Sequence, residues 1–305
     1  MNTSRRLSCR LSRPLTRSLR WLLFAWVFVA RESARSWTGL ASSADGVKLV
    51  AVAEAGQIYT STDSGVTWTP RDSVRQWRAA ASSADGAKLV AAVDGEQIYT
   101  STDSGVTWTP RDSVRQWRAA ASSSDGVKLV AVEYGGQIYT STDSGVTWFA
   151  RAAAQGWSAV ASSANGVKLV AAVDGGQIYT STDSGATWTF RDTARFWFNV
   201  ASSADGVKLV AVVNGGQIYT SSDSGATWVA RAADRSWLGV ASSSDGTKLV
   251  ATVIGGQIYT STDSGVTWVA RDQVRNWFAV ASSSDGLKIL AAVSAGQLYT
   301  GKFQS

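Results

Sequence analysis

The side chains of this 305-residue chain best suited to recognising a charged ligand are arginines that accompany a recurring tryptophan. They lie two residues before that tryptophan or directly after it, at Arg75, Arg78, Arg115, Arg118, Arg195, Arg235 and Arg275. Because a planar guanidinium binds a carboxylate or phosphate through two parallel hydrogen bonds, these residues predict a surface for an acidic partner. Tyr134 and Phe196 are aromatic residues outside the repeat register, of the kind that recognition surfaces often use.

Side chains for the common catalytic mechanisms are scarce. The chain contains no histidine, and Cys9 is its single cysteine. This composition excludes the usual zinc ligand sets, disulfides, Cys–His dyads and Ser–His–Asp triads. We therefore expect a protein that is not an enzyme and that carries no cofactor and no metal. One alternative is a glycan-binding or glycoside-hydrolysing protein, which would need a non-repeated acid pair among Glu54, Glu96 and Glu133 near a central channel.

The net charge of +6 is located in the N-terminal segment. Residues 1–30 hold six arginines and no acid, so basic and acidic residues balance in the rest of the chain, which argues against a nucleic-acid partner. Residues 1–20 are rich in Arg and Ser, and the apolar run 21–30 is too short to span a membrane. We expect residues 1–26 to be a leader for an organelle (a plastid) or for secretion, with no stable membrane insertion.

A 40-residue repeat must position the arginines. One set of tryptophans recurs every 40 residues from Trp37 to Trp277, and a second set recurs from Trp68 to Trp268. Within the unit 197–236, turn residues separate four β-prone segments, at 197–202, 208–213, 217–221 and 226–231. Four short strands per unit of about 40 residues are typical of a β-propeller blade. Residues 27–305 are therefore predicted to form an all-β, seven-bladed propeller.

The count of seven requires that the chain ends meet in one blade. The last unit begins at Trp277 and contains only three of the four strand segments. The N-terminal sequence from Phe28 to Trp37 matches that from Trp268 to Trp277, with Phe28 in the place of the tryptophan. We expect residues 27–31 to supply the missing outer strand of blade seven, which would leave no open edge between the two ends.

The third turn of six units reads S-[TS]-D-S-G-[VA]-T-W, with its aspartate at Asp63, Asp103, Asp143, Asp183, Asp223 and Asp263. This motif resembles the Asp-box (BNR repeat) of sialidases, sortilin-type receptors and photosystem II stability/assembly factor propellers. Together with S-S-x-D-G-x-K-L-V and Q-I-Y-T-S, it most resembles the assembly-factor type. That resemblance implies a non-catalytic platform for protein assembly and a structural role for the aspartates, whose carboxylates would accept hydrogen bonds from their own turn. The arginine triad and tyrosine nucleophile of a sialidase are not visible at non-repeating positions.

Blade topology separates the conserved and variable parts of the unit. The Asp-box turns and the turns between strands one and two belong to one face, whereas the turns between strands two and three and the interblade links belong to the other. Variation and the arginines concentrate on this second face, hereafter the link face. We expect a monomer whose link face binds a protein or other acidic ligand. Two alternatives are arginines consumed in interblade salt bridges, with their stems on aromatic rings, and a recently amplified array without an evolved ligand.

Overall fold

A computed structural model describes residues 26–303, in which all regular secondary structure is β-strand. The predicted leader, residues 1–26, therefore lies outside the described residues except for Trp26. The strands are β1 (Trp26–Ala30), β2 (Trp37–Ser42), β3 (Leu49–Ser61), β4 (Thr69–Ser82), β5 (Leu89–Ser101), β6 (Thr109–Ser122), β7 (Leu129–Glu133), β8 (Ile138–Ser141), β9 (Phe149–Ala150), β10 (Trp157–Ser162), β11 (Leu169–Ser181), β12 (Thr189–Ser202), β13 (Leu209–Ser221), β14 (Val229–Ser242), β15 (Leu249–Val253), β16 (Gly256–Ser261), β17 (Val269–Arg275), β18 (Trp277–Ser282), β19 (Lys288–Val293) and β20 (Leu298–Phe303).

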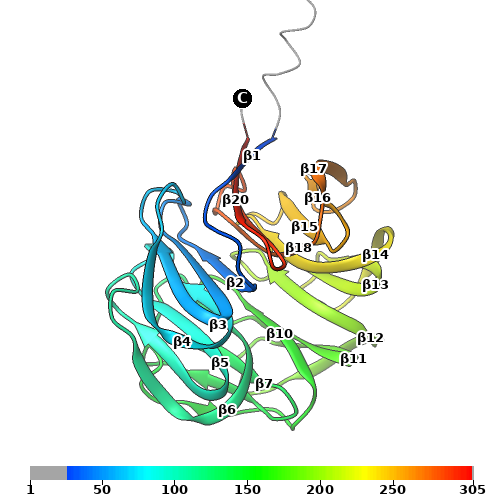
Figure 1. Cartoon of the computed structure of the whole chain (residues 1–305). Coiled ribbons are helices and arrows are strands. Elements are labelled where there is room, and N and C mark those ends of the chain that lie inside the picture. The colour runs from blue at the N-terminus through cyan, green and yellow to red at the C-terminus, as the bar shows by residue number, and fades with distance from the viewer. Residues whose placement is uncertain (1–25, 304–305) are drawn as a thin grey trace, which may run out of the picture.

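Each 40-residue unit forms one antiparallel blade, and the blades are arranged around a central axis (Figure 1). Several long strands belong to two neighbouring blades. The first residues of β4 pair with β3, and its last residues, 77–82, pair with β5. Such a strand is the outer strand of one blade, the link, and the inner strand of the next. We number the blades by their inner strands, so blade 1 starts at Trp37 and blade 7 at Trp277.

The observed strands follow the predicted segments of the unit 197–236 with two differences. The second and third segments, 208–213 and 217–221, belong to one continuous strand, β13, with no break between them. The fourth strand of blade 5 was predicted to start at Ala226, but β14 starts at Val229. The Asp223 carboxylate accepts a hydrogen bond from the backbone N–H of Thr227 at 2.9 Å, which keeps residues 226–228 in the turn. Within residues 26–303 there is no helix that is long and apolar enough to cross a membrane.

The hydrophobic core lies between successive blades. Trp77 of blade 2, for example, packs with Val50, Val52 and Ile58 of blade 1. The tryptophan at the start of every inner strand is buried, and a tyrosine ring lies edge-on to it at 5.1–5.4 Å between centroids. The second strand of each blade is covered on both faces, which explains its continuous Val, Leu and Ala sequence.

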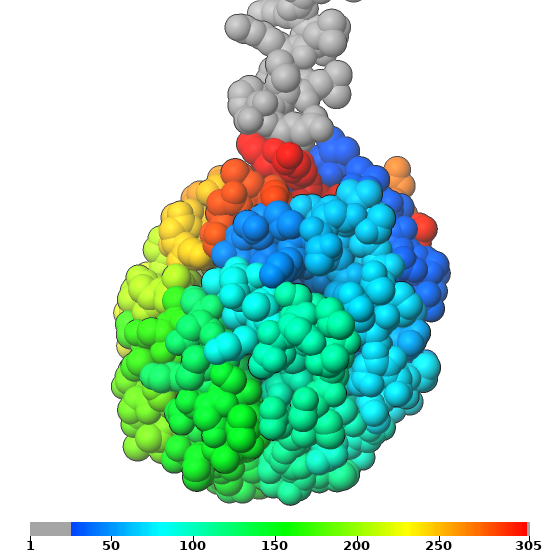
Figure 2. All heavy atoms as spheres, turned by 90° about the vertical axis from the view of Figure 1, so that its left-hand side faces the viewer, coloured from blue at the N-terminus to red at the C-terminus, as the bar shows by residue number. Residues whose placement is uncertain are grey.

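Blade 7 is completed by the N-terminal strand, as predicted. Its strand order is β1-β20-β19-β18, and the blue and red ends of the chain lie side by side in two views (Figures 1 and 2). Phe28 pairs with Gly301, and its ring lies 6.2 Å from that of Trp277. In blade 6 the corresponding ring, that of Trp268, lies 6.3 Å from Trp237. Phe28 thus occupies the tryptophan position of the repeat.

A closed ring of backbone hydrogen bonds joins all seven blades. In each turn between strands one and two, one N–H donates to the carbonyl of the equivalent residue in the next blade. The N···O distances are 2.7–2.8 Å for the donors Ala44, Ala84, Ser124, Ala164, Ala204, Ser244 and Ser284. The Ser284 N–H donates to Ala44, so blade 7 is joined to blade 1 in the same manner as any other neighbouring pair.

Replacement of the half-buried Phe28 by alanine tests this closure. We expect Phe28→Ala to lower the free energy of unfolding by about 1–3 kcal/mol, somewhat less than truncation of a fully buried phenylalanine. The matched control is Val29→Ala on the same strand, whose side chain is 42% exposed and whose truncation is expected to cost less than about 0.5 kcal/mol. Urea denaturation followed by tryptophan fluorescence measures both, and equal effects would contradict the closure of blade 7 by Phe28.

Candidate functional site

The residue directly after the buried tryptophan faces the central axis in every blade. The pairing register of the inner strand is interrupted immediately after the tryptophan; in blade 3, Trp117 pairs with Glu133 and Ala119 with Val132, which leaves Arg118 without a partner. Such a bulge re-aims one side chain away from the regular alternation of the strand. The seven residues at this position, hereafter the mouth residues, are Thr38, Arg78, Arg118, Ser158, Phe198, Leu238 and Phe278.

The mouth residues line one central pocket with a volume of about 230 Å³. The next residues of the inner strands also line it, and most of these are Ala, Val or Gly. Asn199 is the exception at its repeat position, where the other blades have Gly or Ala. Arg78 and Arg118 are the charged residues of the lining, which contains no acid. Seven side chains, one from each repeat, therefore meet at the central pocket.

The two arginines of the pocket have different partners. Arg78 lies between two carboxylates, with N–O distances of 3.0 Å to Glu54 of the preceding blade and 3.0 Å to Asp94 of its own. Around Arg118, the repeat places Asp94 at the position that Glu54 has around Arg78, and Tyr134 at the position that Asp94 has. Asp94 already contacts Arg78, and Tyr134 carries no charge. No ion pair or hydrogen bond joins the Arg118 guanidinium to another side chain in residues 26–303. Arg118 is thus the cationic group of the pocket that retains its full hydrogen-bonding capacity.

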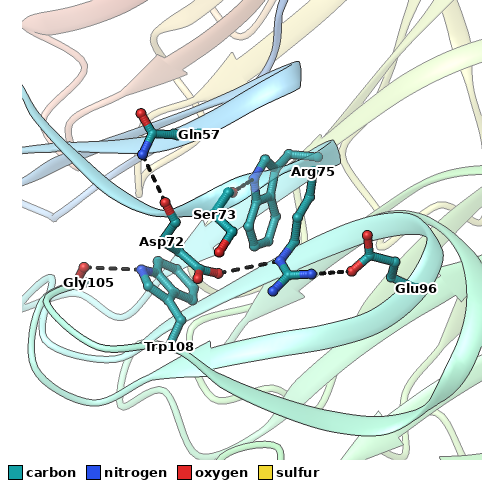
Figure 3. A network of polar contacts seen from close by, with 8 residues as sticks. Gln57, Asp72, Ser73, Arg75, Glu96, Gly105 and Trp108 are labelled. Atoms are coloured by element: carbon teal, nitrogen blue, oxygen red, sulfur yellow. Dashed lines mark hydrogen bonds and ion pairs between the residues drawn. The ribbon is translucent and has the colours of Figure 1, made fainter.

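The arginines two residues before the tryptophan lie in interblade contacts instead. Arg75 lies 3.6 Å from the carboxylate of Asp72 and also binds Glu96 of the next blade (Figure 3). Its guanidinium carbon is 4.6 Å from the centre of the Tyr99 ring. The same combination of a carboxylate three residues earlier and a tyrosine of the next blade holds Arg115, Arg195 and Arg275. These side chains therefore connect neighbouring blades.

Arg235 differs from this group because residue 232 is alanine where the equivalent arginines have an acid. Its guanidinium lies 4.9 Å from the Tyr259 ring, and it forms no ion pair among the described residues. Arg235 is exposed, as are Tyr134 at 50% and Phe196 at 65%. These three residues belong to the link face but do not line the central pocket.

The acids of the glycosidase alternative are also engaged by arginines. Glu54 binds Arg78, Glu96 binds Arg75, and the Glu133 carboxylate lies 3.7 Å from Arg115 and accepts a hydrogen bond from the Tyr139 hydroxyl. None of the three lines the central pocket. They are therefore parts of separate ion pairs rather than members of one acid pair.

The Asp-box aspartates organise their own turns. In the turn of blade 2, the Asp103 carboxylate accepts hydrogen bonds from the N–H and hydroxyl of Thr107 at 2.9 and 2.7 Å. Gly105 has φ of +81°, and a Cβ there would lie 2.7 Å from Thr60 of the preceding blade, so only glycine fits. The turns of the other copies repeat these contacts. Within residues 26–303 no cluster of three or more acidic, histidine or cysteine residues is suited to a metal ion.

These hydrogen bonds make the aspartates strong acids. The Thr67 hydroxyl and backbone N–H hold the pKa of Asp63 at about 2, and the equivalent bonds from threonine do the same for Asp103, Asp183 and Asp263. The carboxylates stay ionised at neutral pH while their hydrogen-bonding capacity is used within the turn. The carboxylates of the Asp-box turns consequently have little hydrogen-bonding capacity left for a ligand.

Comparison with known proteins supports the fold. No protein-family model and no curated protein sequence matches this chain. The solved structure of YCF48 from Cyanidioschyzon merolae matches with a TM-score of 0.72 and 18% identity, covering 92% of this chain and 98% of that chain. A structure of YCF48 bound to D1 peptide also has a TM-score of 0.72 and 18% identity, with 92% and 97% covered. The GH74 xyloglucanase from Xanthomonas campestris has a TM-score of 0.73 and 16% identity, with 92% and 54% covered.

At such identities the likeness establishes a common fold. The predicted β-propeller and its resemblance to the photosystem II assembly factor propellers are confirmed at that level. The neighbours differ in what their names describe, since one is bound to a peptide and another is a glycoside hydrolase. The function of this chain must therefore be argued from its own side chains.

The sequence indicated part of the pocket and missed part. Arg78 and Arg118 stood out because they follow the link tryptophan. Asn199, Leu238 and Phe278 were not predicted as site residues, although Leu238 and Phe278 occupy the same column of the repeat. A comparison of the residue that directly follows the repeat tryptophan in each of the seven units would have identified all the mouth residues.

Neutralisation of one Asp-box carboxylate should produce a pH-dependent loss of stability. The folded-state pKa of Asp103 is about 2, below the usual value near 3.9 for an unfolded chain. Its contribution is therefore complete above about pH 5 and is lost as the pH falls toward 2. We expect Asp103→Asn to lower the free energy of unfolding by about 1 kcal/mol at pH 7. In urea titrations the difference from the unsubstituted chain should shrink toward pH 2; a constant difference would contradict the assigned role of the carboxylate.

Proposed function

We propose that this chain is a non-catalytic protein-binding propeller that presents its link face to an acidic segment of a partner protein. The observation that carries the proposal is the Arg118 guanidinium, which lies at the central pocket without an ion pair among residues 26–303. A guanidinium left with free donors in a concave site is well suited to a carboxylate.

Arg235 adds a second guanidinium of the same kind. The link-face arginines with acidic partners, such as Arg75 and Arg195, already have compensated charges. Arg118 and Arg235 belong to links three blades apart, so they would mark two points of a surface that crosses the pocket. Tyr134 and Phe196 supply exposed aromatic area on the same face.

A peptide-bound propeller among the solved structures supports the type of interaction. That protein, YCF48, has the same fold over nearly its whole length, and it is bound to D1 peptide. The identity of 18% leaves the partner of this chain open. We therefore assign the partner by chemistry, as a protein segment rich in Asp or Glu.

Charge reversal on the link face tests the proposal. We expect the full chain to capture a partner from a native extract, and Arg118→Glu/Arg235→Glu to reduce that capture at least tenfold, since two attractive contacts become repulsive. The matched control adds four glutamates to exposed positions on the Asp-box face, at Thr62, Thr102, Thr142 and Thr182, and lowers the net charge by the same amount. Quantitative mass spectrometry of the captured proteins measures the difference.

Equal loss of capture in both variants would show a dependence on net charge alone and would contradict a link-face site. If the unsubstituted chain captures nothing specific, the account of a repeat array without an evolved ligand is favoured instead. Activity of the purified chain on glycosides would overturn the non-catalytic part of the proposal.

A further inference from the structure

The central pocket has two chemically distinct sides. Blades 5, 6 and 7 contribute Phe198, Leu238 and Phe278 at the mouth, whereas blades 1 to 4 contribute Thr38, Arg78, Arg118 and Ser158. The backbone bulge that presents the mouth residue occurs in all seven blades. The backbone of the repeat therefore does not by itself require the apolar residues to be grouped in three neighbouring blades. At the mouth positions the pocket thus has an apolar side and a polar side, and the amide of Asn199, which follows Phe198 in blade 5, is a polar group on the apolar side.

The apolar side is a built surface. The rings of Phe198 and Phe278 meet edge to face with their centroids 6.1 Å apart, although the residues belong to blades 5 and 7. Leu238 of the intervening blade is only 4% exposed. An apolar group that enters the pocket would therefore contact aromatic faces and edges that are already positioned.

On the polar side most hydrogen-bonding groups are already used. The Thr38 hydroxyl donates to the carbonyl of Trp77 at 2.8 Å, and the Ser158 hydroxyl donates to that of Trp197 at 2.9 Å. Arg78 is held by its two carboxylates. These three residues connect blades, so they have little capacity left for a ligand.

The remaining donors belong to Arg118 and Asn199. The side-chain oxygen of Asn199 accepts a hydrogen bond from the N–H of Val200 at 2.8 Å, which leaves its amide NH₂ available. A pocket whose free polar groups are a guanidinium and an amide NH₂, with no acid in its lining, is suited to an anion. One uncompensated guanidinium matches a single negative charge, as on a carboxylate.

The size of the pocket limits the ligand. Sites for drug-sized ligands have volumes of about 300–1,000 Å³, so 230 Å³ admits a smaller group. A carboxylate joined to one apolar side chain, comparable in size to a single amino-acid residue, would fill both sides at once.

We propose that the central pocket binds a carboxylate attached to one apolar or aromatic group, with the anion at Arg118 and the apolar group on Phe198 and Phe278. The C-terminal residue of a polypeptide and a free small acid share this chemistry. The inference deepens the proposed function and rests on it, because Arg118 contributes to both.

Isothermal titration calorimetry on the full chain tests the pocket directly. The small probes are 3-phenylpropanoate, its uncharged amide and acetate; the peptide probes are acetyl-Ala-Ala-Phe with a free C-terminus and the same peptide amidated. We expect 3-phenylpropanoate to bind at one site per chain, and its amide and acetate at least tenfold more weakly. Arg118→Gln and Phe278→Ala should each weaken binding at least tenfold, whereas Lys302→Gln, which removes the same charge at an exposed position outside the pocket, should leave it unchanged. Thermal melts of each variant verify folding.

The peptide probes distinguish the two sources of the carboxylate. Tighter binding of the free-acid peptide than of 3-phenylpropanoate supports a polypeptide C-terminus, and the reverse order supports a small acid. Absence of saturable binding by both acids, or equal binding of acids and amides, overturns the pocket proposal. If the acids bind but no partner is captured, the proposed function fails and the pocket proposal stands. If a partner is captured through Arg118 and Arg235 but neither acid binds, the pocket proposal fails and the proposed function stands.

Discussion

The ring of seven backbone hydrogen bonds is the constraint on which the rest of this structure depends. Each bond joins equivalent turns of neighbouring blades at 2.7–2.8 Å, and the bond from Ser284 to Ala44 closes the ring. Because every link repeats the same geometry, an error in blade size or number would prevent the last bond from forming. The strict 40-residue period, and the use of the N-terminal strand β1 to complete blade 7, both satisfy this requirement.

Closure also determines where specificity is possible. Many polar side chains of the unit are used in contacts that occur six times around the ring, such as the Asp-box turn around Asp103 and the stacking of Arg75 on Tyr99. Those contacts maintain the ring and vary little between blades. The mouth position is different, because its side chain faces the axis and its residue type varies between blades. The seven mouth positions hold five residue types, and together they produce one pocket with an arginine side and an aromatic side.

Much of this architecture could be predicted from the sequence, because the period, the turn residues and the match of Phe28 to Trp268 are local signals. The contacts of individual arginines could not. Arg75 and Arg235 occupy the same repeat position, yet Asp72 and Glu96 compensate only the first. Likewise, Arg78 and Arg118 follow identical tryptophans, but two acids of neighbouring turns contact Arg78. Which arginine a shared acid contacts, as with Asp94 between Arg78 and Arg118, depends on side-chain geometry that a repeat alignment does not contain.

Hydrogen exchange of the ring amides, resolved by NMR spectroscopy, is the most direct test of this account. The amides of Ala44, Ala84, Ser124, Ala164, Ala204, Ser244 and Ser284 should exchange slowly and at similar rates, because they open only when the closed ring opens. The Ser284 amide is decisive, since it joins the last blade to the first. Protection of Ser284 equal to that of the other six would support a closed seven-bladed ring that creates the central pocket. Rapid exchange at Ser284, with the other six protected, would contradict it.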